Sequence, residues 1–136
     1  MPAEHILIVD DNPQNQKLAR VLLASEGYEV RAAGSAEEAL RVLEEFRPEV
    51  ILMDLQLPGM DGLELTRRLK ADPDRSSIAI IAVTAYAMKG DDARAFAAGC
   101  DGYVTKPLDI DELPKTIRAH LALRASSATE DGAVAE

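Results

Sequence analysis

Short apolar runs that stop at polar residues constrain the fold of this chain more than any other feature. Four such runs occupy residues 6–9, 50–53, 78–83 and 103–104. Runs this short and this apolar are typical of strands that are buried on both faces of a parallel sheet. A weaker strand is predicted over residues 28–32, where apolar and polar residues are mixed.

Amphipathic segments separate these runs and predict helices. Asn12 followed by Pro13 suits the start of the first, and Ser35 with Glu38 forms a capping box for the second. Pro114 lies where the fifth helix is expected to begin, so that helix is predicted to kink or to start late. The predicted helices run over residues 13–27, from 36 towards 48, from about 61 to 72, over 91–98, and from about 109.

Strand and helix alternate five times, which predicts an α/β fold with right-handed crossovers. We expect a flavodoxin-like, doubly wound (βα)5 sandwich with a five-stranded parallel sheet in the order 2-1-3-4-5. In that order the first and third strands are neighbours, so Asp10 and Asp11 should lie beside Asp54. Residues 1–124 are predicted to form this domain, and residues 125–136 a flexible C-terminal tail.

Composition narrows the classes of function. A length of 136 residues with 47% apolar content suits one compact domain. The net charge of −9 argues against direct binding to nucleic acid, and no apolar stretch reaches the roughly 20 residues that span a bilayer. We therefore expect a cytoplasmic chain that contacts neither nucleic acid nor membrane. Cys100 is the single cysteine and is expected to be a buried, reduced thiol.

The polar residues at the strand ends suggest phosphate chemistry. Carboxylates at adjacent strand ends repel one another unless a cation neutralises them, and magnesium prefers such oxygen ligands. A carboxylate such as Asp54 can itself be the nucleophile and form an aspartyl phosphate. Lys106 and the hydroxyl of Thr84 are candidates to contact the phosphoryl oxygens.

These residues resemble a known family. Asp10-Asp11, Asp54, Thr84 and Lys106-Pro107, in this order and at strand ends, resemble the receiver domain of two-component response regulators, the CheY-like family. The resemblance covers residues 4–123, and the segment 51–62 is itself typical of the family. Residues 83–91 are most similar to single-domain regulators of the DivK type and to receivers of hybrid kinases.

The resemblance implies a phosphorylation-activated signalling module with no separate substrate. Asp54 would accept a phosphoryl group from a phosphohistidine on a histidine kinase or a histidine phosphotransfer protein. Asp11 and Asp54 would ligate Mg²⁺ directly, Asp10 through water and Gln56 through its backbone carbonyl, with Mn²⁺ as a substitute. Thr84 and Lys106 would bind the phosphoryl oxygens.

The resemblance also implies how the signal is read. Thr84 and Tyr103 would form the switch, and the fourth helix, fifth strand and fifth helix would contact a downstream protein target. Pro107 would follow a cis peptide bond, and Gln56 and Tyr86 would tune the lifetime of the phosphoryl group. The chain is expected to be a monomer or a weak dimer.

Three alternatives compete with this interpretation. An aspartate-nucleophile phosphatase of the haloacid dehalogenase type usually has a second acid two residues after the nucleophile, where this chain has Gln56. A flavin-binding module would need a phosphate loop after the first strand, where Asp10 and Asp11 would repel phosphate. A receiver-like module that binds partners without phosphorylation would not need all the matched residues.

The two histidines, His5 and His120, are assigned no site.

Overall fold

The computed structural model describes residues 4–55, 57, 62–84, 90–106 and 109–134, with no side-chain description for Asp91 or beyond Leu123. Its five parallel strands follow the order β2-β1-β3-β4-β5, as predicted. The strands are β1 (His5–Val9), β2 (Glu29–Ala33), β3 (Val50–Asp54), β4 (Ala79–Thr84) and β5 (Gly102–Thr105). The helices are α1 (Pro13–Ser25), α2 (Ala36–Leu43), α3 (Gly62–Ala71), α4 (Asp91–Ala98) and α5 (Glu112–Val134).

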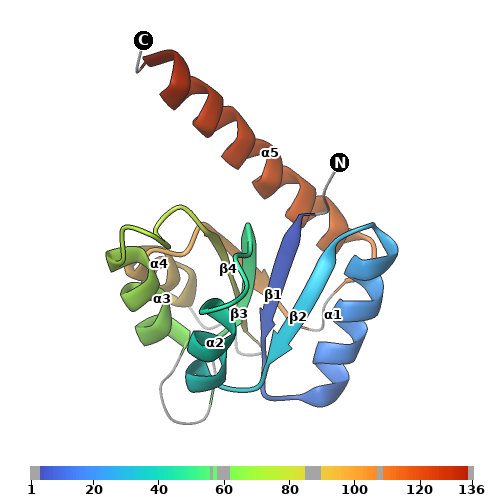
Figure 1. The fold of residues 1–136 in the computed structure, drawn as a ribbon. Coiled ribbons are helices and arrows are strands. Elements are labelled where there is room, and N and C mark those ends of the chain that lie inside the picture. Colours follow the sequence, from blue (N-terminus) through green and yellow to red (C-terminus); the bar gives the residue numbers. More distant parts are fainter. Residues whose placement is uncertain (1–3, 56, 58–61, 85–89, 107–108, 135–136) are drawn as a thin grey trace.

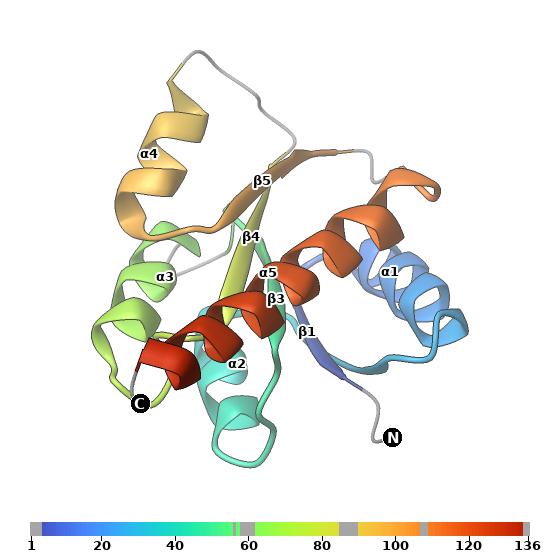
Figure 2. The same cartoon turned by 90° about the horizontal axis from the view of Figure 1, so that it is seen from above.

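Helices cover both faces of the sheet (Figures 1 and 2). Ile6 and Ile8 of β1 belong to an apolar cluster that includes residues of α1 and α5. Leu7 and Val9 belong to the opposite cluster, with residues of α2, α3 and α4. Successive strand side chains point to opposite faces, so a strand covered on both sides must be apolar throughout. This explains why the central strands are unbroken apolar runs.

The helix starts follow the predicted capping residues. The Asn12 side chain accepts hydrogen bonds from the backbone N–H groups of Gln14 and Asn15, and Pro13 occupies the first turn of α1. Ser35 accepts from the Glu38 N–H at 3.1 Å. The Glu38 carboxylate accepts from the Gly34 N–H, one residue before the cap that the sequence predicted. Both motifs hold a helix start directly after a strand.

α5 begins late, which is one of the two outcomes predicted from Pro114. Its first helical residue is Glu112, so Pro114 lies in the first turn, where a missing N–H costs least. The Asp109 side chain accepts from the N–H groups of Asp111 and Glu112. The helix continues to Val134 and projects past the sheet (Figure 1), whereas a flexible tail was predicted from residue 125. The domain boundary at residue 124 stays a prediction.

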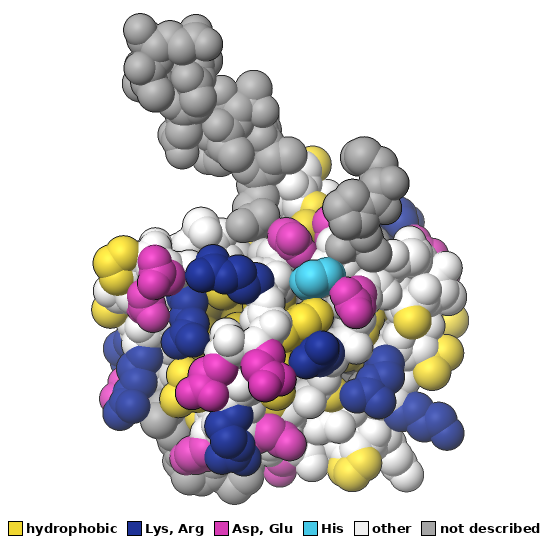
Figure 3. Space-filling view, viewed as in Figure 1, with side chains coloured by type: hydrophobic (Ala, Val, Ile, Leu, Met, Phe, Trp, Pro, Cys, Tyr) yellow, Lys and Arg dark blue, Asp and Glu magenta, His cyan; other side chains and the backbone are white. Residues whose placement is uncertain are grey.

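Charged side chains of both signs are interspersed on the face seen in Figure 3. Two of the ion pairs join Lys70 Nζ to Asp101 Oδ2 at 2.8 Å and Arg118 Nη1 to Glu26 Oε1 at 2.7 Å. The described residues on the face in view therefore form no continuous basic stripe. Of the described helices, including the 23-residue α5, none is both long and apolar enough to cross a membrane.

The start of α3 touches the end of β3. The Gly62 N–H donates to the Leu55 carbonyl at 3.4 Å. A Cβ atom on Gly62 would lie 2.3 Å from the Asp54 carbonyl oxygen and 3.0 Å from the Leu55 Cα, which are backbone atoms that cannot move alone. Gly62 is thus needed for the close approach of α3 to the strand that carries Asp54.

Gly62→Ala should lower the free energy of unfolding by about 2–3 kcal/mol, the upper part of the range for overpacking, because backbone atoms must shift. Urea unfolding of both proteins measures the difference. Gly34→Ala is the matched control, since its Cβ would meet only side-chain atoms at 3.5 and 3.8 Å. Equal stability of the two variants would contradict the close approach seen at Gly62.

Candidate functional site

Parallel pairing brings the ends of β1, β3, β4 and β5 to one edge of the sheet. The register aligns Val9 with Met53, Asp54 with Val83, and Thr84 with Thr105. Asp10 and Asp11 directly follow β1, Asp54 is the last residue of β3, and Lys106 directly follows β5. Residues that are far apart in sequence therefore meet at this edge. In open α/β sheets, ligands bind at the carboxyl ends of the strands, which is the edge described here.

Three carboxylates form an acidic cluster at this edge, made of Asp10, Asp11 and Asp54. One oxygen from each lies within 4.8 Å of the other two. Asp10 and Asp54 are buried, with 5% and 2% of their surfaces exposed, whereas Asp11 is exposed. Buried like charges this close destabilise the ionised state unless a cation offsets them.

Lys106 supplies part of that positive charge. Its Nζ lies 3.0 Å from Asp54 Oδ2 and 3.4 Å from Asp10 Oδ2. Burial, the largest single influence, acts to lower the pKa of the ammonium group. The hydrogen bonds that Lys106 donates to Asp54 and Asp10, with the charges of these two carboxylates, together outweigh it, so the pKa of Lys106 lies above its ordinary value.

Thr84 and Tyr103 lie on the neighbouring strands. Thr84 is buried, and its carbonyl accepts the Lys106 N–H at 2.7 Å. This backbone hydrogen bond holds the Lys106 backbone next to the end of β4. Tyr103 is partly buried, pairs with Ala82 in the register, and packs against the core beneath α2, α3 and α4. Gln56, Tyr86 and Pro107 lie outside the described residues.

The donor set suits a hard divalent cation. The cluster offers carboxylate oxygen atoms, and two of its three carboxylates, Asp10 and Asp54, pair with the Lys106 ammonium group. Magnesium takes oxygen ligands and commonly uses one or two carboxylates together with phosphate oxygens and water. The chemistry of the residues present therefore fits Mg²⁺.

The backbone around Asp10 is held by contacts that the sequence did not indicate. The Gln16 side-chain amide donates to the Asp10 carbonyl, and the Asn12 N–H donates to Asp10 Oδ1 at 2.8 Å. The spacing of six residues between Asp10 and Gln16 has no recognised signature. Only the placement of α1 against the end of β1 reveals the contact.

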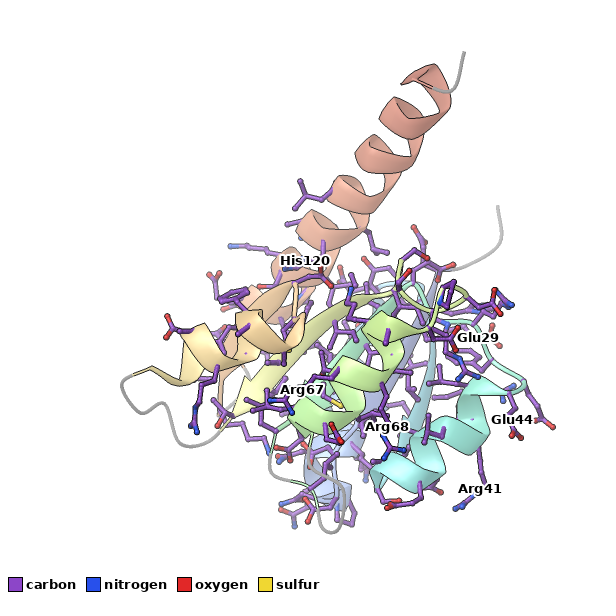
Figure 4. The ribbon with its side chains drawn as sticks, turned by 90° about the vertical axis from the view of Figure 1, so that its left-hand side faces the viewer. Glu29, Arg41, Glu44, Arg67, Arg68 and His120 are labelled. Carbon is purple, nitrogen blue, oxygen red and sulfur yellow. The ribbon has the colours of Figure 1, made fainter. Side chains whose placement is uncertain are left out.

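The histidines lie away from the acidic cluster. His5 is the first residue of β1, at the opposite edge of the sheet. His120 lies on α5 (Figure 4), where its ring occupies the space over Gly102, the first residue of β5. A groove of about 410 Å³ also lies at this opposite edge, between the segments 43–49 and 72–78. Neither histidine nor the groove contributes to the acidic cluster.

The raised pKa of Lys106 predicts a loss of stability at high pH. A folded-state pKa above the unfolded value of about 10.4 means that the stabilisation is complete below that pH and is lost as the pH rises through the folded pKa. The difference in unfolding free energy between the wild type and Lys106→Met, in metal-free buffer, should be constant from about pH 7 to 9.5 and shrink above about pH 10.5.

Urea unfolding across this pH range measures the difference. Lys115→Met is the control, because Lys115 is exposed and lies 3.8 Å from an equally exposed Glu112. A pH-independent difference for Lys106→Met would show that the ammonium contributes no charge stabilisation at the acidic cluster.

Sequence comparisons agree with this geometry. A family model described as the response regulator receiver domain matches residues 6–118. The polar-differentiation response regulator DivK of Brucella anthropi is 45% identical over 116 residues, which are 85% of this chain and 94% of that protein.

Solved structures show the same fold. A CheY-like receiver domain protein from Methanospirillum hungatei JF-1 is 32% identical with a TM-score of 0.86, covering 93% of this chain and 99% of that one. The receiver domain of a sensor histidine kinase from Pseudomonas aeruginosa PAO1 is 36% identical with a TM-score of 0.81, covering 89% and 99%. That structure has a magnesium ion coordinated in its active-site cleft.

These matches bear on the competing interpretations. The match over residues 6–118 and the DivK relatives assign the acidic cluster to a signalling receiver rather than to a dehalogenase-like phosphatase or a flavin-binding module. The strand order and the arrangement of Asp10, Asp11 and Asp54 are consistent with that assignment. The chain belongs to the receiver-domain family of two-component response regulators.

Proposed function

We propose that Asp54 is the phosphoacceptor of this receiver. The observation that carries the proposal is the ion pair of 3.0 Å between the buried Asp54 carboxylate and Lys106, at the edge where Asp10 and Asp11 gather. Asp54 is the one member of the cluster that ends a central strand, and Lys106 already lies where phosphoryl oxygens on Asp54 would need a positive charge.

The chemistry is a phosphoryl transfer between two proteins. An Asp54 carboxylate oxygen attacks phosphorus, the new P–O bond forms, and the P–N bond to the donor imidazole breaks. The imidazole nitrogen leaves with the electron pair and takes up a proton. Water later attacks the acyl phosphate and returns the free carboxylate and inorganic phosphate, a step we assign to the receiver itself.

Asp11 and Asp54 would hold Mg²⁺ directly, Asp10 through water and the Gln56 backbone carbonyl as a further ligand; Mn²⁺ would substitute. When bound, the ion offsets negative charge on the phosphoryl oxygens. The oxygen-only donor set supports this assignment, as does the magnesium in the cleft of the Pseudomonas aeruginosa relative. Thr84 and Lys106 would bind phosphoryl oxygens, the first by its hydroxyl and the second by its ammonium.

Readout of the phosphorylated state would use Thr84 and Tyr103. They lie on the adjacent strands β4 and β5, and Tyr103 is only partly buried, which leaves room for a change of orientation. We assign the signalling surface to α4, β5 and α5, a cis peptide to Pro107, and control of phosphoryl lifetime to Gln56 and Tyr86.

A receiver takes its phosphoryl group from a histidine kinase or a histidine phosphotransfer protein and acts on a downstream protein. We propose that this chain does so in the cytoplasm, as a monomer or weak dimer, without a separate substrate and without direct contact with nucleic acid or membrane. Phosphorylation shifts the balance between two conformations only by its differential interaction with them.

Acetyl phosphate with Mg²⁺ should add one phosphoryl group to the wild type, since it supplies the same group without a protein donor. Intact-protein mass spectrometry measures the addition. Asp54→Asn should take none, because the nucleophilic oxygen is lost, whereas Asp74→Asn, at an exposed acid between α3 and β4, should react normally. Phosphorylation of Asp54→Asn at wild-type level would refute the assignment. No phosphorylation of the wild type by acetyl phosphate or a phosphohistidine donor would favour the phosphorylation-independent module.

Asp11→Ala should bind Mg²⁺ at least about 10-fold more weakly than the wild type, because one of few direct ligands is removed. Isothermal titration calorimetry is the suitable method, since the chain has no tryptophan. Asp74→Ala is the matched control. Unchanged affinity in Asp11→Ala would remove Asp11 from the ligand set without bearing on Asp54 as acceptor.

A further inference from the structure

The Gln16 side chain connects α1 to the acidic cluster. Its amide donates a hydrogen bond to the Asp10 backbone carbonyl, and the side chain is partly buried. Gln14, on the same turn of the helix, is exposed, and its backbone N–H donates to Asn12 Oδ1 at 2.8 Å. Two glutamines of one helical turn thus have different environments.

The Gln16 contact closes a ring of hydrogen bonds. The Asn12 N–H donates to Asp10 Oδ1 at 2.8 Å, and the Gln16 N–H donates to the Asn12 carbonyl at 3.1 Å. The Gln16 amide then returns to the Asp10 carbonyl. The segment from Asp10 to Gln16 is therefore held at both ends and in the middle.

This ring fixes the direction in which Asp11 leaves the backbone. The Asp10 carbonyl and the Asp11 N–H share one rigid peptide plane, so a bond to the carbonyl sets the orientation of the whole plane. Asp11 is exposed, and within the described parts of the chain no hydrogen bond or ion pair holds its carboxylate. Burial and Lys106 hold Asp10 and Asp54, but the position of Asp11 depends on its backbone.

The Gln16 amide is also enclosed from the other side. Its Nε2 lies 3.8 Å from the position that a Cβ on Gly34 would take, in the connection between β2 and α2. The Asp10 N–H donates to the Ala33 carbonyl at 3.0 Å, next to that connection. Gln16 therefore lies between the end of β1 and the turn after β2, where its rotation is restricted.

We propose that Gln16 is a positioning residue for cation binding: its bond to the Asp10 carbonyl holds Asp11 in place as a ligand. The proposal rests on the proposed function, in which Asp11 and Asp54 hold Mg²⁺. Partners of metal ligands commonly alter affinity by about 10–100-fold, and Gln16 acts through the backbone rather than through a carboxylate, so we expect about 3–10-fold.

Gln16→Met tests the proposal in the full chain, because methionine keeps the length of the side chain and removes the donor. Titration calorimetry should show Mg²⁺ binding about 3–10-fold weaker than in the wild type, while Gln14→Met binds as the wild type does. The Mg²⁺ concentration that half-saturates phosphorylation by acetyl phosphate should rise by the same factor, and the rate at saturating Mg²⁺ should be unchanged. If Gln16 had only a structural role, Gln16→Met would lower thermal stability without raising the half-saturating Mg²⁺ concentration at an unchanged maximal rate.

The wild type provides a test that does not depend on folding of a variant. In ¹⁵N-resolved NMR spectra without metal, the Gln16 side-chain amide protons should exchange with water more slowly than those of Gln14, and Mg²⁺ should shift the Gln16 signals but not the Gln14 signals. Wild-type affinity in Gln16→Met, or equal exchange and no Mg²⁺ shift at Gln16, would overturn the proposal. Phosphorylation of Asp54→Asn would instead refute the proposed function, so the two failures are distinguishable.

Discussion

The parallel register of β1, β3, β4 and β5 is the constraint on which the rest of this molecule depends. At the strand ends it pairs residues that are 44, 29 and 21 positions apart in sequence, so these ends meet at one edge. Helices cover both faces of the sheet and leave that edge open. A shift of one residue in any strand would turn its apolar side chains to the wrong cluster, so core packing specifies the site geometry. The carboxylates therefore meet because the apolar residues before them are buried.

The cost of that arrangement is electrostatic. Asp10 and Asp54 are almost wholly buried, and their charges lie close to that of Asp11. Lys106, which directly follows the outermost strand β5, offsets one of these charges through its ion pair with Asp54. Only 17% of the lysine side chain is exposed, so this ion pair is largely shielded from water. The remaining negative charge favours binding of a cation at this edge.

The sequence predicted those parts of the fold that depend on local rules. The alternation of strands and helices predicted the α/β fold with a parallel sheet, and the expected flavodoxin-like strand order was confirmed. The caps at Asn12 and Ser35 followed from side chains that bond within four residues. Contacts between helices and strands could not be predicted from the sequence. The approach of Gly62 to Asp54 and the Gln16 bond to the Asp10 carbonyl depend on where a helix lies against a strand, which periodicity does not determine. The extension of α5 through residues 125–134 likewise runs against a composition with no apolar repeat.

The close approach at Gly62 restricts how the backbone of the acidic cluster can move. Because α3 begins against the carbonyl of Asp54, the backbone at the end of β3 and the first turn of that helix share one packing arrangement. Any displacement of the acidic edge must carry the start of α3 with it or open a gap there. The position of the first turn of α3 is therefore coupled to that of the Asp54 backbone by direct backbone contact.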